Sequence, residues 1–223
     1  KPDEAIAAVA KSFGAIPSRP AATGIAPPVR FPAHVAAPVT RYHTGAKNQA
    51  EALIAWPTGA GMGNYAESRR LDLLALVFSD RLFEKMRQAA GASYSPGVSS
   101  QWPKGLPGGG RLMAMSQVAP ANVPLFFRMA RDIAADLAKN PVSDDELNRV
   151  KGPLAQQIQR AASSSMFWMQ QMSGGTEDPR RIATLRTIGS DYAGVTPAVL
   201  QQTAAKYLLP ARDWTMVVLP KAK

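Results

Sequence analysis

Apolar side chains recur every three or four residues between Ala66 and Ala89, a spacing that predicts a long helix. They lie at Leu71, Leu74, Ala75, Phe78, Leu82, Met86 and Ala89. On a helix these positions form one stripe, which a folded chain buries. A second apolar side lies next to that stripe, at Leu73, Leu76, Val77 and Phe83. We therefore expect this helix to be covered on more than one face.

The rest of the chain mixes strand and helix patterns. Strands are predicted over residues 38–43, 50–56, 92–98, 111–118 and 214–219. Further helices are predicted over residues 3–13, 122–139, 143–172, 180–188 and 197–208. Turn residues favour a hairpin between the first two strands, and a glycine-rich tip at 103–110 favours another between the next two. Antiparallel strands with helices between them indicate an α+β fold, in which an antiparallel sheet packs against helices.

The predicted helix over 143–172 carries several signals of its own. It opens on a capping box, in which Ser143 accepts from the backbone of Glu146 and Glu146 reaches back. Gly152-Pro153 predicts a kink in its middle. Near its end, apolar side chains gather at Met166, Phe167, Trp168, Met169 and Met172. Such a run fits a binding stripe or core packing, and core packing is our prediction.

The end of the long helix brings two polar side chains of interest. Arg87 lies on its last turn, a turn over 88–91 follows, and Tyr94 comes seven residues after Arg87 on the next strand. A guanidinium offers several fixed donors and a phenol is neutral near pH 7, so this pair suits a backbone carbonyl. The other interpretation is that Arg87 caps the helix and Tyr94 is an ordinary half-buried strand residue. Spacing alone leaves both open.

The order of residues around this corner resembles a known family. Arg81-Leu82-Phe83, Arg87, Gly91 and Tyr94-Ser95 follow one another as in the insulinase/pitrilysin-type zinc metallopeptidases, which include the mitochondrial processing peptidase group. The resemblance spans residues 39–223, is weaker over 1–17, and is most specific over 81–95. It implies the α/β sandwich of that family. It also implies that Arg87 and Tyr94 hold substrate backbone against the zinc site of the other half of the molecule.

The resemblance implies a division of the chain as well. Residues 1–17 are similar to the closing helix of a preceding domain, with Ile6, Val9 and Phe13 on one side. Prolines recur over 18–38, which predicts an extended linker. Residues 39–223 then form the C-terminal peptidase-family domain. Because the chain begins without Met and without a signal-peptide pattern, we expect it to be a piece of a longer protein.

The sequence lacks the zinc motif of this family. Zinc chemistry there needs H-x-x-E-H on a helix, whereas this chain has only His34 and His43, in proline-rich or turn sequence. We predict exposed loop positions for both histidines, no metal ligand and no catalytic residue in this chain, and zinc in the partner half. A serine triad is unsupported too, because no Gly-x-Ser-x-Gly elbow occurs. The chain alone should therefore be inactive.

Two glycine-rich segments, Gly59–Gly63 and Gly105–Gly110, are weaker candidates for lining a peptide chamber. The first leads into Gly61-Met62-Gly63-Asn64-Tyr65-Ala66, which has the spelling of a dinucleotide fingerprint. That fold needs an acidic residue at the end of the next strand, which this strand lacks. No Gly-Lys-Ser or Gly-Lys-Thr follows either. We therefore predict a flexible turn.

Composition narrows the range of partners. The formal charge is +10, but the 26 Lys and Arg residues are scattered and accompany no nucleic-acid module, so we predict no nucleic-acid partner. No apolar run reaches the roughly 18–20 residues that cross a membrane, so no transmembrane segment is predicted. The absence of cysteine excludes thiolate catalysis and disulfides. It also fits a periplasmic location in a bacterium.

Two functions follow from these predictions. In the first, the chain is the substrate-binding, non-zinc half of a zinc metalloendopeptidase, and it orients a peptide for hydrolysis by a zinc-bearing N-terminal half or partner subunit. In the second, it is a catalytically inactive peptide-binding or scaffold subunit of the same fold. A basic nucleic-acid binder, with steeply salt-dependent affinity for DNA, ranks below both. An H-x-x-E-H motif upstream of Lys1, or in a companion gene, would distinguish the first from the second.

Overall fold

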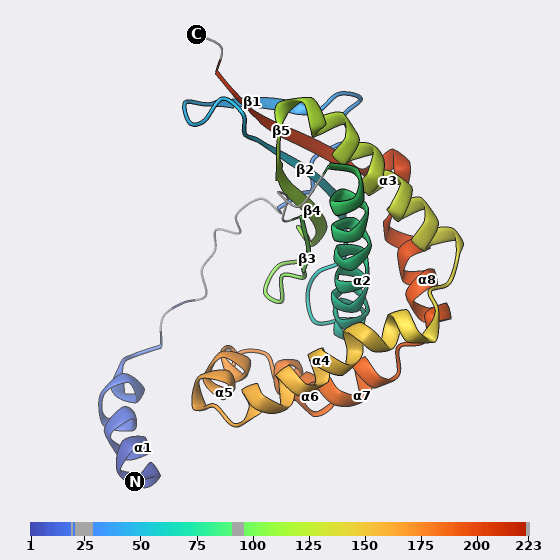
Figure 1. Cartoon of the computed structure of the whole chain (residues 1–223). Coiled ribbons are helices and arrows are strands. Elements are labelled where there is room, and N and C mark those ends of the chain that lie inside the picture. The colour runs from blue at the N-terminus through green and yellow to red at the C-terminus, as the bar shows by residue number, and fades with distance from the viewer. Residues whose placement is uncertain (19, 21–28, 91–95, 222–223) are drawn as a thin grey trace.

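The computed structural model describes residues 1–18, 20, 29–90 and 96–221 (Figure 1). Its strands are β1 Val39–His43, β2 Ala50–Pro57, β3 Gly97–Gln101, β4 Arg111–Val118 and β5 Trp214–Pro220. Its α-helices are α1 Pro2–Lys11, α2 Tyr65–Ala90, α3 Val123–Lys139, α4 Asp144–Ala162, α5 Ser165–Met172, α6 Arg180–Arg186, α7 Ile188–Ala193 and α8 Pro197–Tyr207. Short 3₁₀ turns η1 Phe13–Ala15, η2 Pro120–Asn122 and η3 Pro210–Arg212 complete the described elements.

The five described strands form one sheet in the order β1-β5-β2-β4-β3. The α+β class is confirmed, but the sheet is mixed, because β1 pairs parallel with β5 while the other pairs are antiparallel. The predicted hairpin between residues 38–43 and 50–56 is therefore wrong, since β5 lies between these strands. The apolar β5 suits an interior place, whereas β1 carries exposed Arg41 and Tyr42 and suits an edge. The predicted hairpin of β3 and β4 is confirmed.

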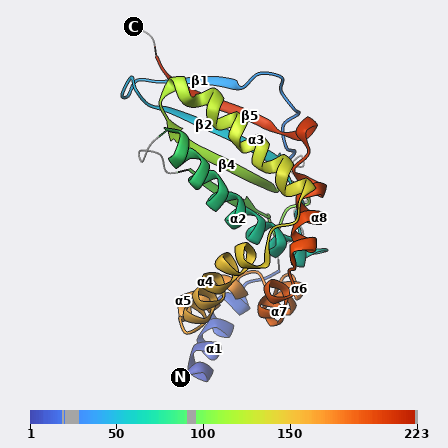
Figure 2. The ribbon, with the colours of Figure 1, turned by 45° about the vertical axis from the view of Figure 1, so that its right-hand side comes forward.

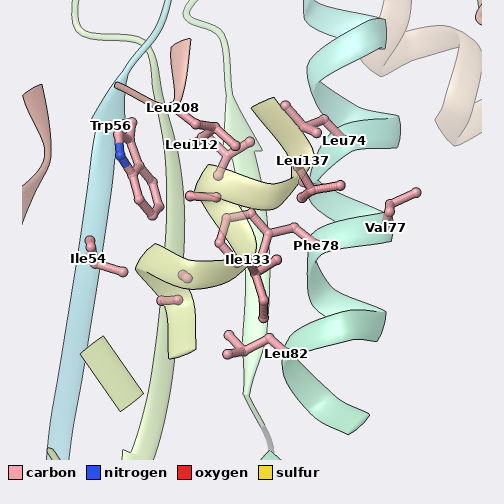
Figure 3. Close-up of a cluster of buried hydrophobic side chains, with 14 of the residues drawn as sticks. Ile54, Trp56, Leu74, Val77, Phe78, Leu82, Leu112, Ile133, Leu137 and Leu208 are labelled. Atoms are coloured by element: carbon pink, nitrogen blue, oxygen red, sulfur yellow. The ribbon is translucent and has the colours of Figure 1, made fainter. Parts of the chain in front are cut away.

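Helices α2 and α3 cover one face of this sheet, and α8 packs against both of them (Figures 1 and 2). Side chains alternate along β2, so that Ile54 and Trp56 point into the core beneath the helices. Trp56 meets Phe78 of α2 with their ring centroids 5.8 Å apart (Figure 3). The main part of the helical layer is thus held to the sheet by one continuous apolar core.

The predicted stripe of α2 is buried from Leu71 to Met86, and Ala89 at its end is exposed. The second apolar side is only half covered. Leu73 and Val77 are buried, whereas Leu76 and Phe83 are exposed. The expectation of cover on more than one face is therefore confirmed at Leu73 and Val77, and it is wrong at Leu76 and Phe83.

The stretch predicted as one helix over 143–172 is two helices, α4 and α5. The cap is confirmed, because the Ser143 side chain accepts from the backbone of Glu146 at 3.1 Å. The core packing predicted for the Met-rich run is wrong: Met166, Met169 and Met172 of α5 are all at least half exposed. Helix α5 lies at the outer end of the α4–α7 arm and packs on α4 and α6, and no second layer among the described residues covers it (Figure 1).

Helix α1 stands apart from the sheet and its helical layer (Figure 1). Every residue of α1 and η1 is exposed, including the apolar side chains Ile6, Val9 and Phe13. The amphipathic pattern predicted for this helix is therefore present without a cover. That pattern fits the closing helix of another domain, and the predicted division at residues 17 and 38 stays a prediction.

Candidate functional site

Arg87 lies on the last full turn of α2, as the sequence predicted. Its side chain is 57% exposed, and its guanidinium donates to Glu84 one turn earlier at 2.9 Å. Such an exposed pair contributes at most a few tenths of a kcal/mol, so it does not hold the arginine firmly. Tyr94 lies outside the described residues. The structure therefore places one member of the predicted pair and leaves their joint position a prediction.

The corner that carries this pair joins the helical layer to an edge of the sheet. Helix α2 ends at Ala90, and the chain enters β3 at Gly97, with Pro96 buried just before it. Strand β3 is the last strand on this side of the described sheet and pairs with β4. Arg87 thus lies at the end of α2 that leads to β3, the edge strand of the described sheet.

The C-terminal half of α2 is fixed in place by Arg81, a residue of the motif that carried the resemblance. Its Nε and Nη2 donate to the two carboxylate oxygens of Glu146 in α4, at 2.6 and 2.9 Å. Its Nη1 donates to Asp136 of α3 at 2.6 Å. The fork geometry is the strong form of an ion pair, and the hydrogen bond to Glu146 raises the pKa of Arg81. Arg81 therefore ties α2 to two other helices.

This role corrects the predicted capping box. Both carboxylate oxygens of Glu146 accept hydrogen bonds from Arg81, in place of the predicted hydrogen bond to the backbone N–H of Ser143. Asp136, the second partner, has its pKa lowered by the Asn140 amide and then by Arg81. A groove of about 370 Å³ opens beside these residues, with Glu84 on its wall. The sequence analysis treated Arg81 only as part of the family motif. Glu146, the acidic residue three places after Ser143, was the available sign of a charged partner for this arginine.

The two glycine-rich segments meet at the other end of α2. Gly61 donates its backbone N–H to Pro103 at 2.7 Å, and Trp102 Nε1 donates to the Gly61 carbonyl at 2.7 Å. A Cβ on Gly59 would lie 2.2 Å from the Trp102 ring, so this glycine permits the ring to pack there. Twenty-two residues of helix, or about 33 Å, separate this end from Arg87. These segments therefore form a packed corner remote from Arg87.

The sequence profile that describes the peptidase M16 inactive domain matches residues 1–154 of the chain. The chain belongs to this family. The predicted resemblance to the insulinase-type peptidases is thereby confirmed. A search of curated proteins finds no match.

Solved structures share the fold of this M16 inactive domain. An M16 inactive domain from Pseudomonas fluorescens is 17% identical with a TM-score of 0.77, and the match covers 100% of this chain and 52% of that one. The periplasmic protease PqqL from Escherichia coli is 18% identical with a TM-score of 0.75, covering 99% and 24%. A protease from Helicobacter pylori is 12% identical with a TM-score of 0.81, covering 99% and 53%. The chain thus spans a quarter to about half of these longer proteins.

At the start of α2, the M16 inactive domain contains a buried polar cluster that sequence reasoning missed. The side chain of Arg69 is 4% exposed and donates to Asp191 of α7, to the Thr184 carbonyl, and to Thr187 Oγ1 at 3.1 Å. Its guanidinium carbon also lies 5.4 Å from the centre of the Tyr65 ring. These contacts fasten α6 and α7 to α2. The available signal was the Arg69-Arg70 doublet inside an apolar helix.

Two further acids extend this cluster. Asp72 accepts from the Tyr192 hydroxyl at 2.9 Å, and burial raises the pKa of both groups. Glu67 is buried and pairs with Lys206 of α8 at 2.5 Å. All of these partners belong to neighbouring helices, so the cluster explains how α6, α7 and α8 are positioned.

The two histidines serve as ties between segments. His34 lies in the linker, exposed as predicted, with its Nδ1 2.8 Å from Oδ1 of buried Asp213. His43 lies half-buried on β1, donates to the Gln49 carbonyl at 2.9 Å and accepts from Gly45 at 3.0 Å, so its predicted exposed position is wrong. Within the described ranges, no three metal-ligand side chains gather around a common point. Among those same residues, no helix has the length and apolar run that a bilayer crossing needs.

Proposed function

We propose that this M16 inactive domain is the substrate-binding half of a zinc metallopeptidase and closes over a peptide that a zinc-bearing half hydrolyses. The family membership supports this proposal. So does the lack of H-x-x-E-H in the sequence, because zinc and its water must then come from another half or subunit. The solved proteases with this fold are two to four times longer than the part matched here, which leaves room for such a half.

In this proposal Arg87 and Tyr94 hold the substrate backbone beside the scissile bond. The observation that carries the proposal is the state of Arg87, whose guanidinium is more than half exposed and paired to a surface carboxylate. A pair this weak exchanges readily for a substrate carbonyl, whereas the rest of α2 is fixed by Arg81. Donors aimed at the carbonyl oxygen stabilise the negative charge that grows there during hydrolysis.

The test uses the intact peptidase, with its zinc half present. Tyr94→Phe and Arg87→Ala should each lower turnover about 100-fold, the loss expected for one donor to a developing oxyanion, while zinc content stays unchanged. Arg128→Ala, an exposed arginine on α3, is the matched control and should leave turnover unchanged. Unaltered turnover in both test variants would remove the pair from the mechanism.

The second candidate is an inactive scaffold subunit of the same fold. The exposed methionines of α5 favour it, because a surface rich in Met suits contact with another protein. Expression with the companion peptidase subunit distinguishes the two proposals. A scaffold would form the complex and leave turnover unchanged when Arg87 and Tyr94 are replaced.

We also propose a periplasmic location for this protein. The absence of cysteine is compatible with it, and one protease with this fold is the periplasmic PqqL. Fractionation of the source cells tests this proposal, and recovery of the protein with cytosolic markers would reject it.

A further inference from the structure

The sheet face opposite α2 and α3 bears rows of side chains that cross the strands. The strand register places five apolar residues side by side in one such row, from one edge of the sheet to the other: Val39, Met216, Leu53, Met115 and Gly97. We call this the methionine row. Met115 is 38% exposed, and the other four residues are half-buried. No helix among the described residues covers this face (Figure 2).

The methionine row is narrow. Two residues along the strands on one side, the next row contains Arg41, Glu51 and Gln117 together with Val218. On the other side, the next row contains Trp214, Ala55 and Met113 and is already occupied by another part of the chain. Rows on one face lie about 7 Å apart, since each residue of a strand advances about 3.3 Å. The open apolar surface is therefore about as wide as one extended chain.

Residues 29–34, which we call the strap, lie over that neighbouring row. At one end a Cβ on Gly109, just before β4, would lie 3.0 Å from Val29 Cγ1. At the other end His34 Nδ1 donates to the backbone carbonyl of Asp213 at 2.7 Å, just before β5. A pocket of about 280 Å³ between strap and sheet is lined by Phe31, Ala55, Trp214 and neighbouring residues, and Leu53 of the methionine row lies on its border. The strap thus runs across β4, β2 and β5 in a non-helical conformation, and this face accepts a chain in that direction.

We propose that the methionine row binds an extended, apolar segment of the peptide substrate, laid across the strands beside the strap. The inference rests on the proposed peptide-binding function and adds a substrate class to it. Five strands about 4.8 Å apart give a row about 19 Å long, which spans about six extended residues. Met side chains adapt their shape, so the row accepts varied apolar side chains. The row ends at Gly97, three residues after Tyr94 in the chain.

A narrow row also argues against the other occupants of an apolar face. A second copy or a folded domain needs an apolar core of several hundred Å² per partner, and here polar residues bound one side of the row and the strap bounds the other. An extended chain needs only one row, as the strap demonstrates on the adjacent one. The observations therefore favour a peptide.

The test measures peptide binding to the 223-residue chain. The probe is a fluorescein-labelled nonapeptide, Gly-Ser-Leu-Ser-Leu-Ser-Leu-Ser-Gly, whose leucines share one face when it is extended. The control peptide has Gln at the three Leu positions. We expect polarisation to report binding of the first peptide only, and to report at least tenfold weaker binding in the double variant Leu53→Gln with Met115→Gln, since two partly buried apolar side chains are lost.

Matched protein controls are Met169→Gln on α5 and Ile6→Gln on α1, both exposed apolar positions elsewhere, which should bind as the parent chain does. Urea unfolding confirms that every variant folds. The proposal is overturned if the parent chain binds neither peptide, if it binds both equally, or if a control variant loses binding while the double variant keeps it. It is also overturned if the double variant only abolishes self-association, because a second copy would then be the occupant.

The intact peptidase separates this inference from the proposed function. If Tyr94→Phe lowers turnover but the double variant leaves KM for Leu-rich and Gln-rich peptides unchanged, the proposed function stands and the methionine row is rejected. If the double variant raises KM for the Leu-rich peptide alone, by about tenfold, while Tyr94→Phe has no effect, the row stands and the role of Tyr94 falls.

Discussion

Helix α2 carries one buried arginine near its start, Arg69, and one exposed arginine near its end, Arg87. Near the start of α2, Arg69 is 4% exposed and contacts two helices, two rings and a backbone carbonyl. At the end of α2, Arg87 is 57% exposed and contacts one surface carboxylate. A buried charge that donates to several buried partners is committed to the fold, whereas an exposed one with a weak partner is available to a ligand. The start of α2 therefore has a structural role, through Arg69, and its end is the candidate functional site, through Arg87.

The largest effect expected from this comparison concerns Arg69. Arg69→Ala should lower the free energy of unfolding by about 3–5 kcal/mol, because it leaves Asp191 without its charge partner in a mostly buried place. The measurement is urea unfolding followed by circular dichroism. Arg70→Ala is the matched control, since Arg70 is the exposed neighbour in the same helix and should change stability by less than about 0.5 kcal/mol. Equal losses in the two variants would contradict the assignment.

Arg81 stands between these extremes, and a smaller loss is expected there. Arg81→Ala should cost about 1–2 kcal/mol, because a 22% exposed side chain loses a forked pair that solvent partly screens. Arg81→Lys keeps the charge but not the fork, so it should recover only part of the loss. Full recovery by lysine in the same unfolding measurement would show that the charge alone matters.

The difference between the two ends also explains what the sequence could predict. The periodic apolar positions of α2 and the alternation along β4 follow from local pattern, and their elements appear close to the expected bounds. The place of β5 between β1 and β2 does not follow from local pattern, because β5 begins 158 residues after Trp56 and enters the sheet between strands that are close in sequence. Local turn residues therefore predicted a pairing that the distant strand prevents.

The same limit applies to side-chain roles. The sequence predicts a role for Arg87 because the motif that contains it lies within the short range 81–95. The partners of Arg69 lie on α6 and α7, more than 110 residues away, and no local spacing announces them. The predicted core packing of the run on α5 is wrong for a related reason, because burial of an apolar helix depends on whether another layer reaches it, and no layer among the described residues does.

Asp72, next to Arg69 in the structural cluster, predicts a pH effect of smaller size. Burial raises the pKa of Asp72 above its ordinary value, so the folded state holds this proton more tightly than the unfolded state. Its contribution to stability is therefore present below the ordinary pKa and lost as pH rises through the raised one. Asp72→Asn keeps an acceptor for Tyr192 and should be more stable than the parent at pH 7, with little difference at pH 3. If Asp72→Asn is less stable than the parent at pH 7, the attraction between the Asp72 carboxylate and the Arg69 guanidinium outweighs the cost of burying the carboxylate charge.

The smallest stability effect is expected at Arg87 itself, and it gives the comparison its sharpest form. Arg87→Ala should change the free energy of unfolding by less than about 0.5 kcal/mol, because only an exposed pair with Glu84 is lost. Glu84→Ala breaks the same pair from the other side and should be equally neutral, while it frees the guanidinium. If both variants are neutral in unfolding but only Arg87→Ala impairs turnover of the intact peptidase, the arginine acts on substrate and not on the fold. A loss above 1 kcal/mol in Arg87→Ala would instead make this arginine a structural residue like Arg69.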